Sequence, residues 1–204
     1  MENTESNYDI MARQAQERVL TFDQQPIIRK FQLRSDPESI YLSFSGSPYR
    51  ISRSDGAIYC LDGSSARKAG FNEALSIYDM LCCPTESPFL SGIWESISSL
   101  GGIIGAGHSS STMLSRRGLP FSGKTEQLSK ACLSLGGRPA SSGDVSFILP
   151  VFDFFPVWFQ FWDGDDEFPP SIRFLWDRNT FQYLHYETLW YIMNHILDKL
   201  QSML

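Results

Sequence analysis

The sequence predicts an α+β fold in which helices pack on a largely antiparallel sheet. Strand patterns occur as a meander in the N-terminal half and as aromatic strands in the C-terminal third. Helical patterns stand before, between and after them, without the strict β–α–β alternation of a parallel sheet. The length of 204 residues and the absence of an internal repeat favour one domain that spans residues 1–204.

The first part of the chain predicts a helix followed by three strands. Ser6 or Asn7 can cap a helix that runs to about Leu20, and residues 23–37 form a looser segment. Alternating apolar residues then mark strands at about 40–44, 49–53 and 57–61. The Asp55-Gly56 pair between the last two strands is a strong hairpin signal.

The middle of the chain predicts two helices on either side of a long loop. Asn72 can cap a helix that Pro84 ends. Residues 101–122 are rich in Gly and Ser and predict a mobile loop, because segments of this kind are usually functional or disordered. A helix from Thr125 to Leu135 follows and ends at Gly136-Gly137.

The C-terminal third predicts a set of aromatic strands and a final helix. The strands lie at about 145–149, 157–162 and 172–176. The helix runs from about Tyr186 to Met203, with Glu187 in its first turn and Lys199 in its last. Both charges match the direction of the helix dipole.

Composition excludes several functional classes. Lys and Arg total 17 and Asp and Glu total 23, so the net charge is −6, whereas binding to nucleic acid requires a basic surface. No apolar run reaches the ~20 residues of a membrane-spanning helix, and the acidic N-terminus does not resemble a secretory signal. We therefore expect a cytoplasmic protein with no nucleic-acid or membrane partner, and a small molecule or another protein as its partner.

The four cysteines predict no metal cluster. They are Cys60, Cys82, Cys83 and Cys132, and no C-x-x-C spacing occurs. We interpret them as small buried residues of a reducing compartment. A redox role for the adjacent pair Cys82-Cys83 is the alternative.

The most acidic segment follows the aromatic strand. Between Trp162 and Pro170, four carboxylates occupy five positions. In an extended segment Asp163, Asp165 and Glu167 point the same way. Converging carboxylates raise one another's pKa, and a hard cation such as Mg2+, Mn2+ or Ca2+ would relieve their repulsion. The spacing is not that of an EF-hand loop. The alternatives to a cation site are a solvated turn and a role in acid–base catalysis.

The aromatic strand suggests a ligand site beside these acids. Aromatic residues usually pack in a core, but alternation places Trp158 and Trp162 on the face opposite Phe159 and Phe161. An uncovered face of this kind would bind a planar ligand or a partner protein. The predicted ligand site consists of Trp158, Trp162, Asp165 and Glu167, together with His108 from the Gly/Ser-rich loop.

A P-loop pattern occurs at Gly118–Thr125, with Gly118, Gly123, Lys124 and Thr125 in the motif positions. In a true P-loop these residues cradle the phosphates of a nucleotide after a buried strand. Here the preceding segment is polar, and Pro120 and Phe121 stand where the loop must wrap tightly. We interpret the pattern as a chance match, with nucleotide binding as the alternative.

The three histidines, His108, His185 and His195, share no metal-binding spacing on one helix. We expect a structural role for His195 on the final helix. Any of the three could join the acidic segment in space to form a His/carboxylate metal site.

Gly, Pro, Trp and acidic residues recur in a distinctive order along the C-terminal half. The order comprises Gly136-Gly137, Gly143-Asp144, Pro150, Pro156, Trp162-x-Gly164-Asp165-x-Glu167-Phe168-Pro169, Leu175-Trp176-Asp177 and Tyr183-Leu184, with Ser91-Gly92-x-Trp94 upstream. It resembles the prokaryotic family known as domain of unknown function 3786. The resemblance implies no established activity. Its members are typical of anaerobes, and some carry a cysteine-rich iron–sulfur segment that this chain lacks.

The leading hypothesis is a ligand-binding or accessory protein of anaerobic metabolism, with its site at residues 158–167. The alternative is a metal-dependent enzyme that uses the Asp163/Asp165/Glu167 cluster, and the third is nucleotide binding through Gly118–Thr125. A divalent cation and a tetrapyrrole or corrinoid are the candidate cofactors. The sequence identifies neither a ligand nor a catalytic residue.

Overall fold

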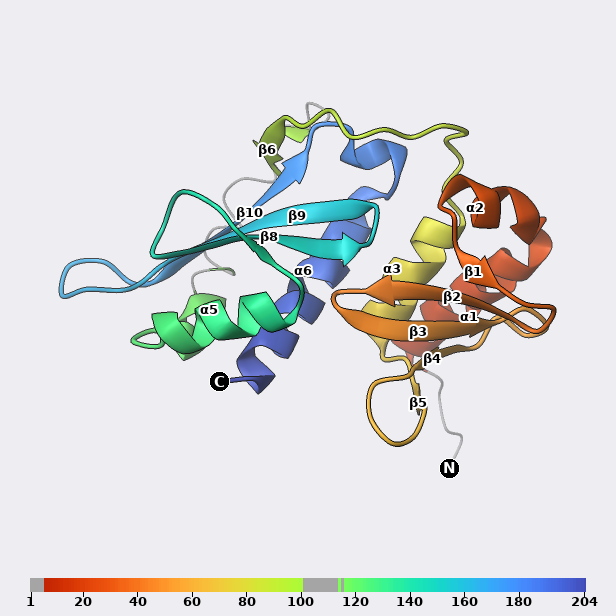
Figure 1. The fold of residues 1–204 in the computed structure, drawn as a ribbon, viewed down its shortest axis with the longest axis horizontal. Coiled ribbons are helices and arrows are strands. Elements are labelled where there is room, and N and C mark those ends of the chain that lie inside the picture. The colour runs from red at the N-terminus through yellow and green to blue at the C-terminus, as the bar shows by residue number, and fades with distance from the viewer. Residues whose placement is uncertain (1–5, 101–113, 115) are drawn as a thin grey trace.

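A computed structural model describes residues 6–100, 114 and 116–204. The predicted α+β fold and its antiparallel strand pairing are confirmed. Within the described residues, the strands form two five-stranded sheets rather than one. Figure 1 shows the sheets side by side, with helix α6 between them.

The first sheet contains the predicted meander. Its strand order is β1-β2-β3-β4-β5, and all neighbours are antiparallel. The strands are β1 (Arg34–Ser35), β2 (Ser39–Phe44), β3 (Ser47–Ser52), β4 (Ile58–Cys60) and β5 (Arg67–Lys68). Alternate residues of β2 and β3 face the core, as the sequence pattern predicts.

The segment expected to be loose contains regular structure. Helix α2 spans Gln24–Lys30, and β1 follows it. The carboxylate of Asp23 caps α2, because its Oδ1 accepts a hydrogen bond from the backbone N–H of Gln25 at 3.0 Å. Ile27 and Ile28 are buried, so packing stabilises a helix too short for its periodicity to be recognised.

The second sheet has the order β6-β10-β9-β8-β7. Its strands are β6 (Trp94–Ser96), β7 (Arg138–Pro139), β8 (Val145–Phe152), β9 (Phe155–Trp162) and β10 (Ser171–Asp177). β8 extends past Pro150 because the pairing with β9 shifts register between Pro150 and Phe152. On β9, Val157, Phe159 and Phe161 are fully buried.

Four longer helices accompany α2 in the described part of the chain: α1 (Asn7–Thr21), α3 (Phe71–Leu81), α5 (Thr125–Ser134) and α6 (Tyr186–Ser202). The predicted cap of α3 is wrong. Gly70 is its N-cap, and Asn72 lies inside the helix. The reason is that Glu73 reaches back to accept the backbone N–H of Gly70, which satisfies a free donor of the first turn. α5 ends as predicted, with Gly136 at φ +79° and the Gly137 N–H bonded to the Cys132 carbonyl at 2.9 Å.

The predicted loop at 101–122 lies largely outside the described residues, since 101–113 and 115 are not described. Its end differs from the prediction. Residues 116–118 are helical, and Leu119–Phe121 forms a 3-10 turn. Phe121 is buried edge-on against Phe161, at 6.1 Å between ring centroids, which anchors this turn to β9.

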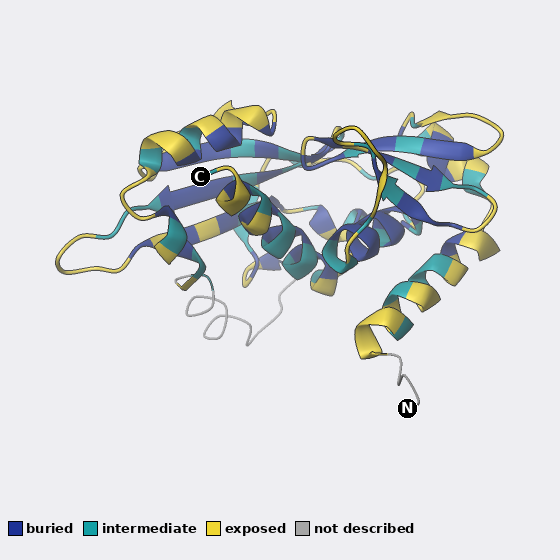
Figure 2. Ribbon diagram, turned by 90° about the horizontal axis from the view of Figure 1, so that it is seen from below, coloured by how far each residue is buried: buried dark blue, intermediate teal, exposed yellow. Residues whose placement is uncertain are grey.

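The turn between β2 and β3 joins the two sheets. The Ser45 N–H donates to the Val151 carbonyl of β8 at 2.8 Å, and the Lys199 ammonium of α6 donates to the Ser45 carbonyl at 3.0 Å. Buried residues of both sheets and of α3 and α6 belong to one hydrophobic cluster. α1 lies on α3 at the edge of this core and exposes most of its surface, with only Val19 buried (Figure 2). Among the described helices, none has the length and apolar character to span a membrane.

Candidate functional site

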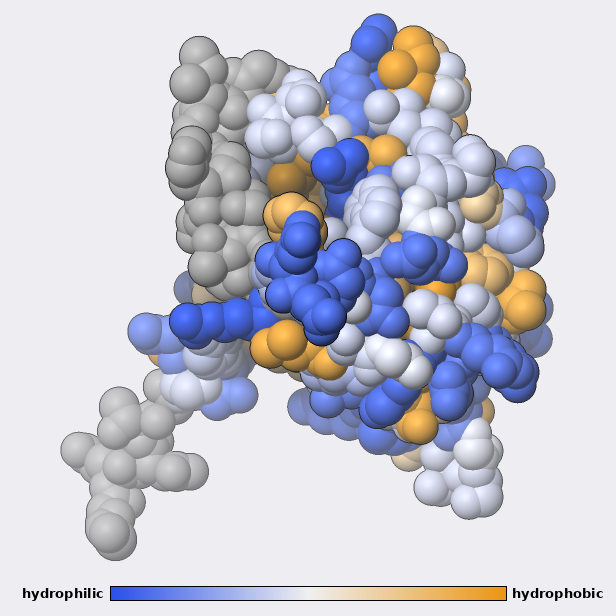
Figure 3. All heavy atoms as spheres, turned by 90° about the vertical axis from the view of Figure 1, so that its left-hand side faces the viewer, coloured by the Kyte–Doolittle hydropathy of each residue, from blue (hydrophilic) through white to orange (hydrophobic). Residues whose placement is uncertain are grey.

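The acidic turn between β9 and β10 uses its carboxylates to bind its own backbone. Asp163 accepts hydrogen bonds from the Ser122 hydroxyl at 2.8 Å and from the backbone N–H groups of Gly123 and Gly164, at 2.9 and 2.8 Å. Asp165 accepts the N–H groups of Glu167 and Phe168 at 2.9 and 2.7 Å. Figure 3 looks onto this end of the molecule, where hydrophilic side chains gather. The geometry accounts for both aspartates as residues that hold the turn.

The electrostatics agree with this role. Burial alone would raise the pKa of Asp163, but hydrogen bonds from Ser122, Gly123 and Gly164 lower it below its ordinary value. Backbone hydrogen bonds from Phe168 and Glu167 lower the pKa of Asp165. Both carboxylates therefore stay ionised without a cation. Glu167 is exposed, and a metal role for these three residues stays a prediction.

The two tryptophans of the predicted ligand site contact other parts of the protein. The indole Nε1 of Trp158 donates to the Ser146 hydroxyl at 2.8 Å, and its ring meets Trp94 edge-on at 5.9 Å. The guanidinium of Arg173 lies 5.3 Å from the centre of a Trp162 ring. Both indoles are half-buried. His108 lies outside the described residues, so the five-residue ligand site stays a prediction.

The P-loop pattern has a different backbone from a nucleotide-binding loop. Gly118 ends a helical stretch rather than following a strand, and a 3-10 turn occupies the centre of the motif. Thr125 begins α5 and Lys124 precedes it, as the pattern requires. However, the Gly123 N–H that would face a phosphate donates to Asp163. A carboxylate of the chain itself thus occupies this donor.

The residues that carry the family resemblance make contacts between strands and loops of the second sheet. Gly143 has φ +77°, and a Cβ there would lie 2.7 Å from the Phe161 carbonyl oxygen. The neighbouring Asp144 accepts the Asp163 N–H at 2.7 Å. Asp177, fully buried at the end of β10, accepts the N–H groups of Ser91 and Gly92 at 2.9 and 2.7 Å. The pattern therefore marks contacts that hold the second sheet and its loops together.

One buried charge cluster, around Glu73, is closed to ligands. The Glu73 side chain is 7% exposed and accepts two hydrogen bonds from the Arg67 guanidinium, at 2.7 and 2.8 Å. The Tyr49 hydroxyl donates to the same carboxylate at 2.5 Å. Burial alone would raise the pKa of Glu73, but the bonds from Arg67, Tyr49 and Gly70 lower it to about 2. This carboxylate is fully occupied by protein donors.

A second cluster of polar side chains lies in an open pocket between α1, α3 and the start of α6. The pocket has a volume of about 370 Å³, within the usual range for small-molecule sites. We call it the α1–α3–α6 pocket. Its apolar walls are Met11, Ala15, Leu75, Tyr78 and Tyr191, and its polar walls include Arg18, Asp79, Cys82, His185 and Glu187.

Asp79 fixes the imidazole of His185 in this pocket. The Nδ1 of His185 lies 2.5 Å from Asp79 Oδ1, and the backbone N–H of His185 donates to Asp79 Oδ2 at 2.8 Å. The Thr188 hydroxyl donates to the same oxygen at 2.6 Å. The Asp79 side chain is 13% exposed and the His185 side chain 57% exposed. A shielded carboxylate therefore holds a ring whose other side is open.

This arrangement defines the tautomer of His185. A carboxylate only accepts hydrogen bonds, so Nδ1 carries the hydrogen of the contact with Asp79. The lone pair of a neutral imidazole is then on Nε2. The ring can accept a proton at Nε2 and return it, while Asp79 holds the ring in this orientation. We call these two residues the His185–Asp79 dyad.

Cys82 lines the pocket but is not part of the dyad. Among the described contacts, no hydrogen bond joins its thiol to His185. Burial raises the pKa of the Cys82 thiol, although Arg18 acts in the opposite direction. The thiol is therefore not an activated nucleophile. No group of three or more His, Cys, Asp or Glu side chains in the described part of the chain is arranged to hold a metal ion.

Sequence reasoning missed Asp79 and the pocket. The two dyad residues are separated by 106 positions, so no local motif joins them. The available signals were Asp79 and Cys82 at an i, i+3 spacing on one helix face, and a histidine directly before the final helix. Neither signal identifies a partner without the packing of α3 against α6.

Comparison with known proteins identifies a family. Residues 23–199 match the family model described as domain of unknown function (DUF3786). Neither the curated proteins nor the solved structures contain a match. The matched residues include both members of the His185–Asp79 dyad, whereas α1 precedes them. The match covers most of the chain, so the chain belongs to the DUF3786 family.

Proposed function

We propose that this protein binds a small organic molecule in the α1–α3–α6 pocket and exchanges a proton with it through the His185–Asp79 dyad. The observation that carries the proposal is the 2.5 Å contact between Asp79 Oδ1 and His185 Nδ1 in an open pocket of about 370 Å³. It supports a general acid–base function, such as removal of a proton next to a carbonyl group or its return to a neighbouring carbon.

Three features of the pocket support this use. The carboxylate that orients the ring accepts two further hydrogen bonds, so Asp79 is held in place before a ligand arrives. The half-exposed ring leaves room for a ligand at Nε2. The apolar walls offer a surface on which the carbon atoms of a bound molecule can pack beside the dyad.

The proposal keeps the expectation that the protein binds a ligand, but it moves the site and adds acid–base chemistry, which the leading hypothesis from the sequence did not include. The carboxylates of Asp163 and Asp165 already accept backbone hydrogen bonds, whereas Asp79 is directed onto a histidine. A ligand-binding role in the cytoplasm stays a prediction from the sequence.

Nuclear magnetic resonance on the full chain tests the proposal. A library of small keto acids, enols and phenols is screened for compounds that shift the Hε1 resonance of His185 but leave that of His195 unchanged. Compounds that bind are then incubated in D2O, and deuterium incorporation is followed by mass spectrometry. We expect incorporation to fall at least about 100-fold in His185→Gln, the scale typical of lost acid–base catalysis.

Two variants provide the controls. His195→Gln changes a histidine on the same helix outside the pocket and should leave incorporation unchanged. Asp79→Asn keeps the size of the side chain but offers an N–H₂ group to the ring, so it should slow exchange by favouring the wrong tautomer. Equal incorporation in wild type and His185→Gln would show that the dyad transfers no proton.

A further inference from the structure

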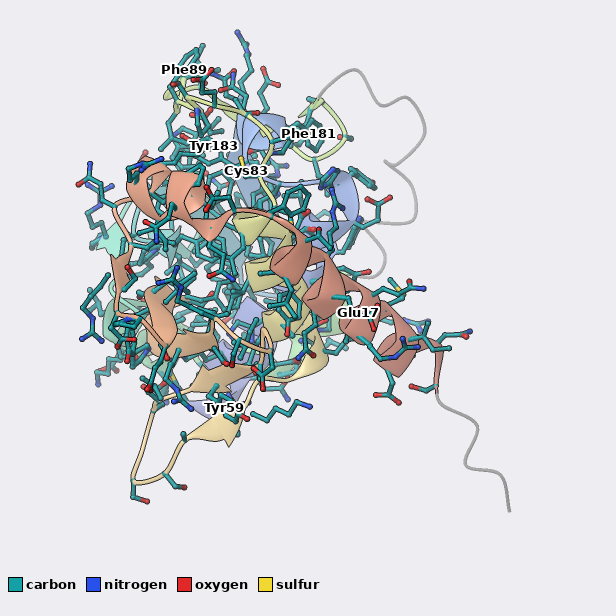
Figure 4. The ribbon with its side chains drawn as sticks, turned by 90° about the vertical axis from the view of Figure 1, so that its right-hand side faces the viewer. Glu17, Tyr59, Cys83, Phe89, Phe181 and Tyr183 are labelled. Atoms are coloured by element: carbon teal, nitrogen blue, oxygen red, sulfur yellow. The ribbon has the colours of Figure 1, made fainter. Side chains whose placement is uncertain are left out.

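A second, larger hollow lies next to the α1–α3–α6 pocket. This hollow has a volume of about 970 Å³ and is formed by the end of α1, α2 and the segment after α3. Arg18 and Cys82 line both spaces, so the two are adjacent. Figure 4 views the molecule from the right of Figure 1, with α1 in front of α3 and Cys83 labelled.

The larger hollow has an apolar floor. Ile27, Leu81 and Pro84 contribute to it, and Phe22 stands at its edge with half of its surface exposed. An exposed phenylalanine beside buried aliphatic residues is a surface that an apolar ligand would cover. The smaller pocket, by contrast, ends at the dyad. The two adjacent spaces therefore offer a polar group in the smaller pocket and apolar side chains in the larger hollow.

The rim of the hollow is cationic in an acidic protein. Arg18, Arg29 and Lys30 line it, against the acids Asp23 and Glu86, whereas the whole chain carries a net charge of −6. The carboxylate of Asp23 is used to cap α2. Arg18 contacts the Phe22 ring at 6.0 Å and makes no ion pair with a described carboxylate. Its guanidinium is thus available to an anion where the two spaces meet.

We infer that the ligand is an amphipathic carboxylate: its head group binds Arg18 beside the His185–Asp79 dyad, and its apolar tail lies along Phe22 in the larger hollow. This inference rests on the proposed function and names its substrate class. The Arg18 guanidinium places the head group, in a pocket that Asp79 and Glu187 also line, and the apolar residues of the larger hollow place the tail. The atoms next to the carboxylate then lie closest to His185.

Titration calorimetry with octanoate, octylamine and 1-octanol tests the head group on the full chain. We expect octanoate to bind at least tenfold more tightly than the other two. Arg18→Gln should abolish this preference, and Arg13→Gln, the same change elsewhere on α1, should preserve it. Octylamine binding as tightly as octanoate would overturn the inference, and so would a tenfold preference for octyl phosphate over octanoate.

A series from butanoate to octanoate tests the tail. Each buried methylene should tighten binding about fourfold. Phe22→Ala should weaken octanoate more than butanoate, and Phe89→Ala, at an exposed phenylalanine outside the hollow, should change neither. Equal affinity along the series would overturn the inference even if Phe22→Ala failed to fold.

The His185 resonance separates this inference from the proposed function. Octanoate that binds with the expected selectivity but leaves His185 Hε1 unmoved would support the ligand class and contradict proton transfer. A keto acid or phenol that exchanges deuterium through His185 while octanoate shows no selectivity would support proton transfer and overturn the ligand class.

Discussion

The two described histidines both lie at α6 and face carboxylates of α3, but their surroundings differ. His185, at the start of α6, contacts Asp79 at 2.5 Å and is 57% exposed. His195, ten positions later, lies 4.0 Å from Glu73 and is 12% exposed. Glu73 is occupied by Arg67, Tyr49 and Gly70, whereas Asp79 directs one oxygen to the imidazole. The same pair of residue types is structural at one end of the helix pair and open to chemistry at the other.

The comparison shows which property distinguishes a site from a structural cluster. Both carboxylates are shielded and both belong to dense hydrogen-bond networks. The difference is that the ring of His195 stacks on Phe44 at 4.9 Å and its Nε2 is buried without a partner, while His185 faces a pocket. The two histidines therefore differ in whether the ring faces a pocket, rather than in closeness to an acid.

The largest effect concerns acid stability and should come from His195. Burial lowers the pKa of His195 to about 4, although Glu73 opposes the shift. The unfolded chain has a pKa near 6.5 at this residue and binds the proton more readily, so stability is complete above about pH 6.5 and falls towards pH 4. The expected loss is about 3 kcal/mol.

Urea unfolding between pH 4 and 8 measures this loss. His195→Phe keeps a ring against Phe44 and should flatten the dependence between pH 6.5 and 4. An unchanged slope in this variant would assign the acid sensitivity to other groups and would remove the contrast between the two histidines.

Glu73→Gln should have the next largest effect, a loss of about 2 to 3 kcal/mol in the free energy of unfolding, because a buried ion pair loses one partner. The half-exposed Arg67 keeps the cost below that of a fully buried pair. Glu17→Gln removes a carboxylate from an exposed pair with Arg13 and should cost less than about 0.5 kcal/mol. Chemical denaturation of both variants makes the comparison, and equal losses would contradict the closed character of the Glu73 cluster.

Asp79→Ala should cost about 1 to 2 kcal/mol, since three donors at the start of α6 lose their acceptor but the His185 ring regains water. Thr188→Val removes only one of the three bonds and should cost about 1 kcal/mol. Thermal unfolding followed by circular dichroism measures both. A smaller loss for Asp79→Ala than for Thr188→Val would indicate that the carboxylate is strained by its contact with the histidine.

His185→Gln should have the smallest effect on stability, within about 0.5 kcal/mol, because the backbone N–H of residue 185 still donates to Asp79. The same variant should abolish deuterium exchange. A loss of more than about 1 kcal/mol would show that the ring is a structural clamp, like His195, and would break the comparison.

Much of the fold follows from local patterns in the sequence. Periodicity identifies α1, α3, α5 and α6, and strand patterns identify the three central strands of each sheet, β2 to β4 and β8 to β10. These patterns do not predict the short edge strands β1, β5, β6 and β7. Single-sequence patterns fail where tertiary packing decides, as for the short helix α2 and for the turn at Leu119–Phe121, which is held by Phe121 against β9. They also do not show that the strands divide into two sheets, because that depends on which edges pair.

The candidate site was less predictable than the fold. The acidic turn attracts attention because its carboxylates are adjacent in sequence, yet adjacency is what allows Asp165 to bind the N–H groups two and three positions later. The dyad joins residues from helices that are distant in sequence. A high density of functional groups in one stretch of sequence is therefore a weak guide to the position of a site. In this protein the candidate site forms where α3 and α6 pack together.

The position of α1 has a consequence for how the family can diversify. The family match begins at residue 23, so the dyad belongs to the shared domain and Arg18 belongs to a helix in front of it. α1 also contributes little to the hydrophobic core, since Val19 is its one buried residue. The reacting pair then lies inside the matched residues, whereas the head-group residue Arg18 lies outside them. Exchange of the leading helix would alter which molecule is accepted and leave the reacting pair untouched.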